Sequence, residues 1–171
     1  MPRIPIELVY MQTAYQFAQL SYAERRKVGC VIVKDHQVIS FGYNGMPHGF
    51  DNSCEETDTR YYENPDLAVD LAEQGYECNN GVCHKHGAIT KPAVLHAESN
   101  AIMKVAKSTM SCVGADLYTT TCPCFGCAKL IIQAGIKMVY YTEEYRDMSG
   151  VELLETAGIE VKQVNTWNGI Q

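Results

Sequence analysis

No run of about 18 uncharged apolar residues occurs in the 171-residue sequence, so no transmembrane helix is predicted. The first residues, 1–8, lack the basic, apolar and small-residue order of a secretory signal. Basic residues are also few, and the net charge of −6 argues against a large surface for a polynucleotide. We therefore expect a cytoplasmic protein, in the host cytoplasm if its source is viral, that binds neither membranes nor polynucleotides.

The sequence also has no internal repeat, no low-complexity tract and only one Cys-x-x-Cys pair, Cys124 and Cys127. Its eight cysteines do not suggest the disulfide framework of a small secreted domain, because the chain is long enough to bury a core of its own. Their grouping favours metal ligands or reduced thiols. The length predicts a single domain over residues 1–171.

Apolar residues at three- and four-residue spacing predict helices, and β-branched runs predict strands. The expected helices are 6–20, 96–107, 125–134 and 151–157, and the expected strands are 28–33, 38–41, 116–120, 137–141 and 159–164. The first two strands form a hairpin, whereas the last three alternate with helices, which is typical of parallel strands joined by right-handed crossovers. The predicted fold class is therefore α/β, a three-layer α/β/α sandwich around a five-stranded mixed sheet.

An irregular segment at about 46–95 separates the hairpin from the second of these helices. A bare loop of this length is unusual inside a compact domain. Pro65 at a first-turn position and Gly75 as a stop signal predict a short helix within it. The remainder carries no clear apolar period, so we expect an insert that is held together by something other than a core.

The residues that carry chemistry begin two of the predicted helices. Cys124 and Cys127 lie three apart, so both thiols face the same side of a first helical turn, where the helix dipole favours thiolates. His96 begins the preceding helix. One imidazole and two thiolates leave the fourth position of a tetrahedral zinc ion open, which is the catalytic pattern. Glu98 is placed as a carboxylate that moves protons beside the metal.

A Cys-x-x-Cys pair by itself is equally typical of redox motifs and of structural zinc ribbons. A ribbon requires a second such pair, which the sequence lacks. A His-x-Glu motif about 25 residues before Pro-Cys-x-x-Cys is instead the pattern of zinc-dependent nucleobase deaminases. The pattern thus favours a hydrolytic zinc site.

Three motifs resemble the deoxycytidylate (dCMP) deaminase family: His96-Ala-Glu-Ser-Asn-Ala-Ile102, Gly42-Tyr-Asn-Gly-Met-Pro47 and the segment 123–136. The likeness covers residues 5–50 and 94–164. It implies the cytidine deaminase fold, zinc on His96, Cys124 and Cys127, and proton transfer by Glu98. The implied reaction is the hydrolysis of dCMP to dUMP and ammonia, which supplies dUMP for dTMP synthesis.

The same resemblance implies residues for substrate and effectors. Asn44 would bind the sugar hydroxyl, although an Asn before a Gly is equally expected in a tight turn. Arg25, Arg26 and Arg146 are candidates for the phosphate, and the sequence does not decide between them. The segment Gly42, Tyr43, Asn44 and Gly45 would form part of a site for dCTP, an activator, and dTTP, an inhibitor, bound with Mg²⁺ in a homo-hexamer.

The insert carries Cys54, Cys78, Cys83, His84 and His86, whose spacing allows a second, structural zinc ion without requiring one. Some relatives in the family have such a site. The alternative is a set of free thiols packed on the insert's helix. Cys30 and Cys112 are read as small buried apolar residues, and Cys122 as a neighbour of the zinc site.

Two other functions remain open at this point. A tRNA adenosine or polynucleotide cytidine deaminase would share the chemistry, but it requires a basic track that the charge of −6 does not favour. A zinc-stabilised nucleotide-binding module without catalysis would have no use for Glu98. We therefore expect an enzyme acting on a small nucleotide.

Overall fold

The computed structural model describes residues 3–165. These residues divide into two compact units. The first contains 3–21, 27–45 and 95–165, and the second contains 22–26 and 46–94.

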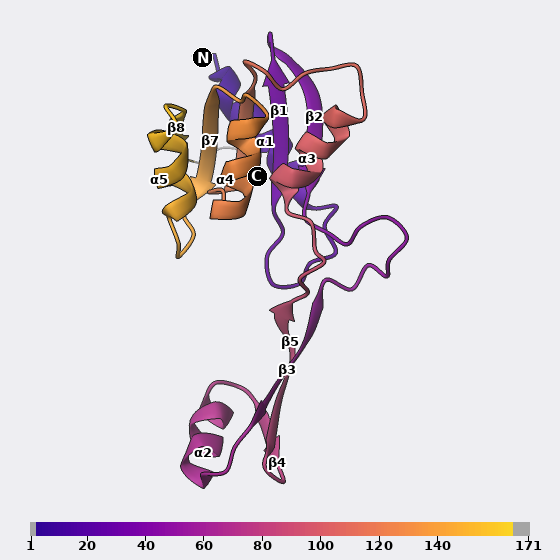
Figure 1. Ribbon diagram of the computed structural model, residues 1–171, viewed down its shortest axis with the longest axis vertical. Coiled ribbons are helices and arrows are strands. Elements are labelled where there is room, and N and C mark those ends of the chain that lie inside the picture. The colour runs from indigo at the N-terminus through magenta and orange to yellow at the C-terminus, as the bar shows by residue number, and fades with distance from the viewer. Residues whose placement is uncertain (1–2, 166–171) are drawn as a thin grey trace. The chain divides into compact units, whose positions relative to one another are not determined.

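A five-stranded sheet forms the centre of the first unit (Figure 1). Its strands are β1 (Gly29–Lys34), β2 (Gln37–Tyr43), β6 (Asp116–Thr121), β7 (Met138–Glu143) and β8 (Glu160–Gln163). They lie in the order β2-β1-β6-β7-β8, with β1 antiparallel to both of its neighbours and β6, β7 and β8 parallel to one another. The predicted mixed sheet is confirmed.

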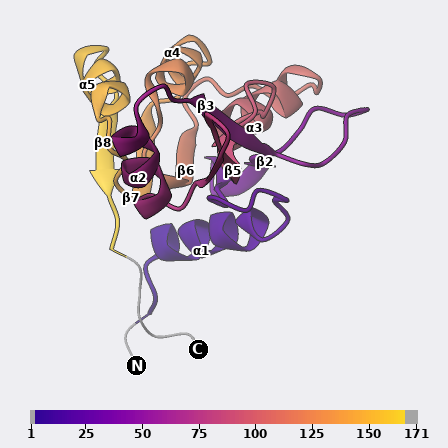
Figure 2. The same ribbon diagram turned by 90° about the horizontal axis from the view of Figure 1, so that it is seen from below.

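Helices cover both faces of this sheet (Figure 2). The helix α1 (Ile6–Ala18) lies on one face, and α3 (Ala97–Ala106), α4 (Phe125–Gln133) and α5 (Ser149–Thr156) lie on the other. Along β1, the buried side chains of Cys30 and Ile32 face α3 and α4, whereas Val31 and Val33 face α1. The β-branched run of β1 is buried because both faces of the sheet are covered, and the predicted α/β/α sandwich is confirmed.

Two glycines let helices approach the sheet at backbone distance. A Cβ atom on Gly29 would lie 1.9 Å from the carbonyl oxygen of Ala14 in α1, and one on Gly42 would lie 2.0 Å from that of Ala97 in α3. No side chain tolerates such distances, so these positions require glycine. The second contact fixes the start of α3, which carries the candidate catalytic residues.

The second unit contains a short helix and a sheet of its own. The helix α2 (Pro65–Glu73) has Asn64 as its N-cap and confirms the predicted helix. The strands β3 (Glu55–Tyr61), β4 (Glu77–Asn79) and β5 (Val82–Thr90) form an antiparallel sheet in the order β3-β5-β4. The sequence did not predict these strands, because their residues are largely polar and only Cys83 among them is buried.

Local interactions replace a large core in this unit. Asn80 and Gly81 both have positive φ, 49° and 83°, as a two-residue hairpin turn between β4 and β5 requires. A disulfide joins Cys78 to Cys83 across that hairpin. The Tyr76 hydroxyl donates a hydrogen bond to Asp58, and the guanidinium of Arg60 lies 3.2 Å from the same carboxylate and 5.5 Å from the Tyr76 ring.

Among residues 3–165, no helix is both long enough and apolar enough to span a membrane.

Candidate zinc and catalytic site

The candidate metal ligands lie at the starts of two neighbouring helices. His96 is the N-cap of α3, and Cys124 is the N-cap of α4, both with extended backbone angles. Cys127 lies in the first turn of α4, and Pro123 precedes both cysteines. Because β6 leads directly into the Pro123–Cys124 loop, the sheet sets the position of both thiols.

The three side chains converge on one point. The Nδ1 atom of His96 lies 3.4 Å from the Sγ atoms of both Cys124 and Cys127. In the part of the chain that the structure describes, this is the only group of three or more such side chains whose ligand atoms lie within 4.8 Å of one another.

This arrangement fits a zinc ion. Zn–S distances of about 2.3 Å and Zn–N distances of about 2.0–2.1 Å place the nitrogen and sulfur ligands of a tetrahedral ion about 3.5 Å apart. The observed 3.4 Å matches this separation. One nitrogen and two sulfur donors suit zinc and leave a fourth position for water.

The electrostatics favour a thiolate at Cys124. Hydrogen bonds with Cys127 and then with His96 lower the pKa of Cys124 to about 3. The pKa of Cys127 is raised, because Cys127 donates to that thiolate and is itself buried. The hydrogen bond with Cys124 also raises the pKa of His96. The N-terminus of α4 adds a partial positive charge beside the thiolate.

Glu98 lies in the first turn of α3 and is 4% exposed. Its burial raises the pKa of the carboxyl group to about 7. A carboxyl group with this pKa can both accept and release a proton near neutral pH. The structure therefore combines a zinc-type donor set with a buried acid–base group two residues from a ligand.

The segment that carries Asn44 borders this site. The Asn44 Oδ1 atom accepts a hydrogen bond of 2.8 Å from the backbone N–H of Val28, which fixes the orientation of the amide. Gly45 pairs with Leu95 through backbone hydrogen bonds of 3.1 and 2.9 Å, immediately before His96. Residues 42–45 therefore hold the start of α3, and this structural role does not depend on a bound nucleotide.

The candidate phosphate residues fall in different units. Arg146 belongs to the first unit, is exposed, and has its guanidinium 5.8 Å from the Tyr145 ring centroid. Arg25 and Arg26 belong to the second unit. There, Arg25 donates to Thr90 Oγ1 at 3.4 Å, and its backbone N–H donates to Glu55.

The structure does not bring the five candidate ligands of a second zinc ion together. Cys78 and Cys83 form the disulfide, and Cys54 is buried with its thiol directed at the carbonyl oxygen of Asn52. The Nδ1 atoms of His84 and His86 instead lie 3.0 and 2.9 Å from threonine hydroxyls of β3. Two of the five ligands are thus already used in a covalent bond.

Two contacts around the Pro123–Cys124 loop, called the metal loop below, were not expected from the sequence. A Cβ atom on Gly150 would lie 2.1 Å from the carbonyl oxygen of Pro123, so the start of α5 packs on the backbone of this loop. The Sγ atom of Cys122 accepts the N–H of Tyr145 at 3.0 Å. No local sequence signal marks either contact, because both join residues more than 20 positions apart.

The fold and the site together define an α/β/α zinc hydrolase, and comparisons with known proteins make this more specific. The family model of the cytidine and deoxycytidylate deaminase zinc-binding region matches residues 6–143. The chain therefore belongs to the cytidine and deoxycytidylate deaminase family, as its motifs predicted.

Individual known proteins are similar to this chain over most of its length. The deoxycytidylate deaminase of Enterobacteria phage T4 is 37% identical over 171 aligned positions, covering 90% of this chain and 87% of the phage protein. ComE operon protein 2 of Bacillus subtilis (strain 168) is 34% identical over 165, covering 96% and 74%. A crystal structure of dCMP deaminase from the cyanophage S-TIM5, in complex with dCMP and dUMP, is 37% identical with a TM-score of 0.73, covering 96% of this chain and 100% of that one.

Proposed function

We propose that the chain is a zinc-dependent enzyme that hydrolyses dCMP to dUMP and ammonia. The observation that carries the proposal is the buried Glu98 carboxyl group, with a pKa of about 7, beside the three zinc-type ligands. Relatives named deoxycytidylate deaminase support the choice of substrate. The product would supply dUMP for dTMP synthesis.

His96, Cys124 and Cys127 would hold the zinc ion, which supplies a Lewis acid that makes water nucleophilic at neutral pH. Glu98 would take a proton from the water that adds to C4 of the cytosine ring. The same carboxyl group would deliver that proton to ring N3. It would then take the second proton of the added water from the new C4 hydroxyl group and deliver it to the amine as the C4–N bond breaks, so one residue acts as base and as acid. Because burial raises the pKa of this carboxyl group to about 7, the group can both accept and release a proton near neutral pH.

Substrate recognition is proposed for Asn44 and for the cationic residues. The amide of Asn44, oriented by Val28, is suited to a sugar hydroxyl. Arg146 follows β7 on the segment that packs against the metal loop, which supports it as the phosphate residue. Arg25 and Arg26 remain candidates on the second unit.

An ultraviolet assay with dCMP, deoxycytidine, dCTP and cytosine tests the proposal. We expect turnover of dCMP and much slower turnover of deoxycytidine, because the latter lacks the phosphate. Equal rates on dCMP and deoxycytidine would reject a phosphate-recognising site. No turnover of any of the four compounds by the zinc-loaded protein would reject the activity itself.

Regulation by dCTP and dTTP with Mg²⁺, through Gly42, Tyr43, Asn44 and Gly45, is part of the proposal and rests on the family resemblance. The same assay with each nucleotide added tests it. Activation by dCTP and inhibition by dTTP are expected, and unchanged rates at saturating dCMP and at low dCMP would reject regulation.

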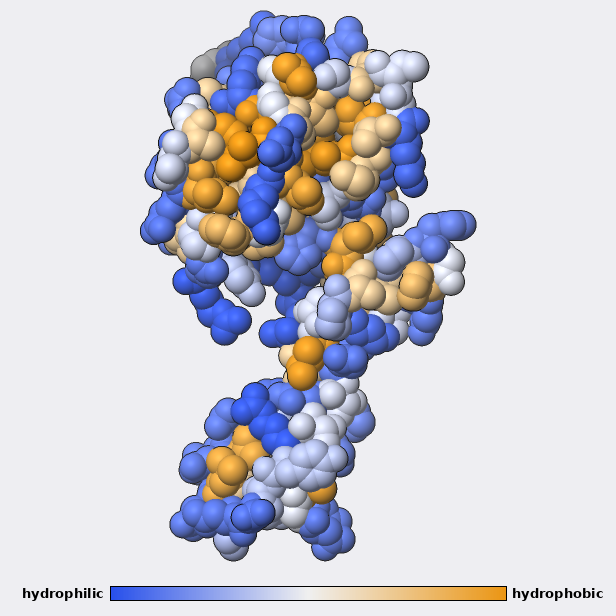
Figure 3. Space-filling model, in the orientation of Figure 1, coloured by the Kyte–Doolittle hydropathy of each residue, from blue (hydrophilic) through white to orange (hydrophobic). Residues whose placement is uncertain are grey.

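Assembly into a homo-hexamer is also proposed. Apolar side chains gather on one face of the first unit (Figure 3). On the helices of that unit, Met103 of α3 and Phe125 of α4 are each 47% exposed, and Leu130 of α4 is 38% exposed. Exposed apolar patches of this kind mark protein–protein contacts. Light scattering on the eluting protein measures the assembly directly, and a monomer at micromolar concentration would reject it.

A further inference from the structure

The segment 144–148, between β7 and α5, carries Arg146 and is held on the loop that carries the metal ligand Cys124. The N–H of Cys122 donates to the carbonyl oxygen of Glu143 at 2.8 Å, which extends the pairing of β6 with β7 by one step. The start of α5 at Gly150 packs on the backbone of Pro123 and Cys124 without room for a side chain. The two ends of the segment are therefore fixed to the metal loop.

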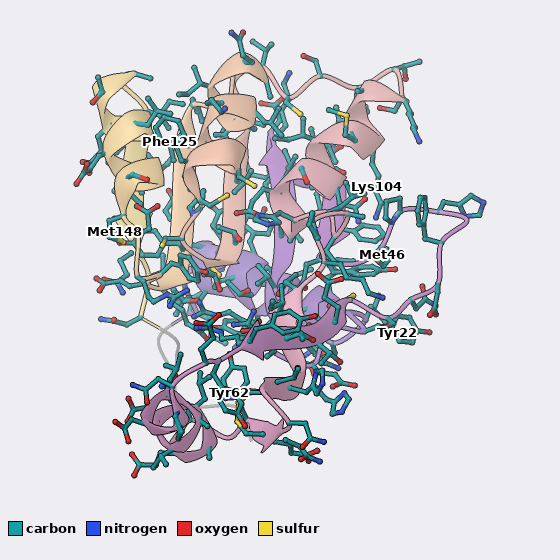
Figure 4. The ribbon with its side chains drawn as sticks, turned by 60° about the horizontal axis from the view of Figure 1, so that its bottom comes forward. Tyr22, Met46, Tyr62, Lys104, Phe125 and Met148 are labelled. Atoms are coloured by element: carbon teal, nitrogen blue, oxygen red, sulfur yellow. A yellow bond between two sulfur atoms is a disulfide. The ribbon has the colours of Figure 1, made fainter. Side chains whose placement is uncertain are left out.

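A thiol also contacts the middle of the segment. The Sγ atom of Cys122 accepts the backbone N–H of Tyr145 at 3.0 Å and donates its own hydrogen to the Sδ atom of Met148, with 3.7 Å between the two sulfur atoms. Met148 lies just before the first turn of α5 (Figure 4). Cys122 is only 4% exposed and packs with Tyr141 and Val151, so water does not compete for these contacts.

Tyr145, whose backbone N–H binds Cys122, is the neighbour of the candidate phosphate ligand Arg146. Arg146 follows Tyr145 directly, and its guanidinium lies 5.8 Å from the Tyr145 ring centroid, within cation–π range. A displacement of the Tyr145 backbone would therefore move both the origin of the Arg146 side chain and the ring against which it rests.

We propose that Cys122 is a positioning residue for the substrate phosphate, acting through Tyr145 to hold Arg146 at a fixed place relative to the metal loop. The inference rests on the proposed function, specifically on Arg146 as a phosphate ligand. Cys122 is not among the three residues proposed to bind zinc. Its thiol acts as a neutral hydrogen-bond acceptor whose partner is a backbone amide.

Three substitutions separate the hydrogen bond from packing. Cys122→Val fills the buried space but offers no hydrogen-bond acceptor. Cys122→Ala leaves the space empty and removes the acceptor of the Tyr145 amide. Cys122→Ser keeps an acceptor, on a shorter side chain. Cys112→Val is the matched control, because Cys112 is also a buried thiol, 6% exposed, and precedes β6 whereas Cys122 follows it. Zinc content and melting temperature of each variant identify any that fail to fold or to hold metal.

Two readouts apply to the zinc-loaded proteins. The first is hydrogen exchange of the Tyr145 amide, which we expect to accelerate in Cys122→Val and Cys122→Ala and not in Cys112→Val. The second is KM for dCMP, which we expect to rise roughly 3- to 10-fold in Cys122→Val, the factor that one lost hydrogen bond produces. A smaller rise is expected in Cys122→Ser, and kcat should change less than KM.

A double-mutant cycle with Arg146→Gln tests the route of the effect. If Cys122 acts through Arg146, adding Cys122→Val to Arg146→Gln raises KM no further. Full additivity, or a wild-type KM in Cys122→Val, overturns the inference. An unchanged KM in Arg146→Gln would reject the phosphate role of Arg146 and this inference with it, while turnover of dCMP would still support the proposed reaction.

Discussion

The carbonyl oxygen of Ala97 lies 2.0 Å from the point that a Cβ atom on Gly42 would occupy, and the backbone nitrogen of Ala101 lies 2.7 Å from it. Ala97 is the first residue of α3 and separates His96 from Glu98. The edge strand β2 therefore packs directly on the helical turn that carries a candidate metal ligand, His96, and the candidate acid–base group, Glu98.

Gly42→Ala should therefore damage the site as well as the fold. The added methyl group must push α3 away from the sheet, at a cost of about 1–3 kcal/mol of folding free energy. Thermal unfolding should show a lower melting temperature, by roughly 2–4 °C per kcal/mol. Zinc affinity, measured by competition with a chromogenic chelator, should also fall because His96 moves with the helix.

Gly45→Ala is the control for that experiment. A Cβ atom on Gly45 meets nothing within 4 Å, although the residue lies in the same segment. Its melting temperature should equal that of the wild type. A wild-type melting temperature and zinc affinity in Gly42→Ala would contradict the close packing of β2 on α3.

Glu98→Gln should retain zinc and lose turnover. Glutamine has the same shape as glutamate but cannot accept and release protons, and the loss of general acid–base catalysis lowers kcat by about 10²–10⁴-fold. Zinc is measured by atomic emission, and turnover by the absorbance change on deamination of dCMP. Glu152→Gln, an exposed carboxylate of α5, is the matched control and should keep full turnover. Normal turnover in zinc-loaded Glu98→Gln would rule out the proposed proton carrier.

Metal analysis should give one zinc ion per chain, because only His96, Cys124 and Cys127 converge as a ligand set among residues 3–165. Cys124→Ala should lose that zinc and the activity together, whereas Cys54→Ala should keep both. Chelation should remove activity, and added zinc should restore it. Two zinc ions per chain, with free Cys78 and Cys83 thiols in a titration, would contradict the disulfide of the second unit.

The Asp58 carboxylate should make the stability of the second unit sensitive to acid. The hydrogen bond from Tyr76, and then the one from Arg60, lowers the pKa of Asp58 below its ordinary value of 3.8. A carboxyl group with a lowered folded-state pKa stabilises the fold above its unfolded-state pKa, and this contribution disappears as the pH falls through the folded-state pKa. The contribution of Asp58 to the stability of the second unit should therefore disappear as the pH falls below about 4.

Asp58→Asn is expected to be less stable than the wild type at neutral pH and to approach it at acid pH. Thermal unfolding curves recorded across this range measure the difference. Asp70→Asn, an exposed carboxylate on α2 of the same unit, is the control and should show no such convergence. A pH-independent difference between Asp58→Asn and the wild type would show that the Asp58 charge does not contribute.

The sequence predicted the first unit well because its signals are local and strong. The β-branched run of β1 and the apolar periods of α1, α3 and α4 are each set by burial on one or two faces, which a sequence pattern records directly. The strands of the second unit left no such pattern. They are held by backbone pairing, the Asn80–Gly81 turn and a disulfide rather than by buried apolar side chains.

The chemistry proposed for the site could be predicted from residue identities and their spacing. A histidine, two cysteines three apart and a glutamate two residues from the histidine are chemical identities, and their spacing at helix starts needs no tertiary knowledge to interpret. The contacts that hold these groups in place could not be predicted in this way. These contacts join distant parts of the chain, and they exist only once the sheet has brought its strands together. They are Gly42 with Ala97, Gly150 with Pro123, and Cys122 with Tyr145.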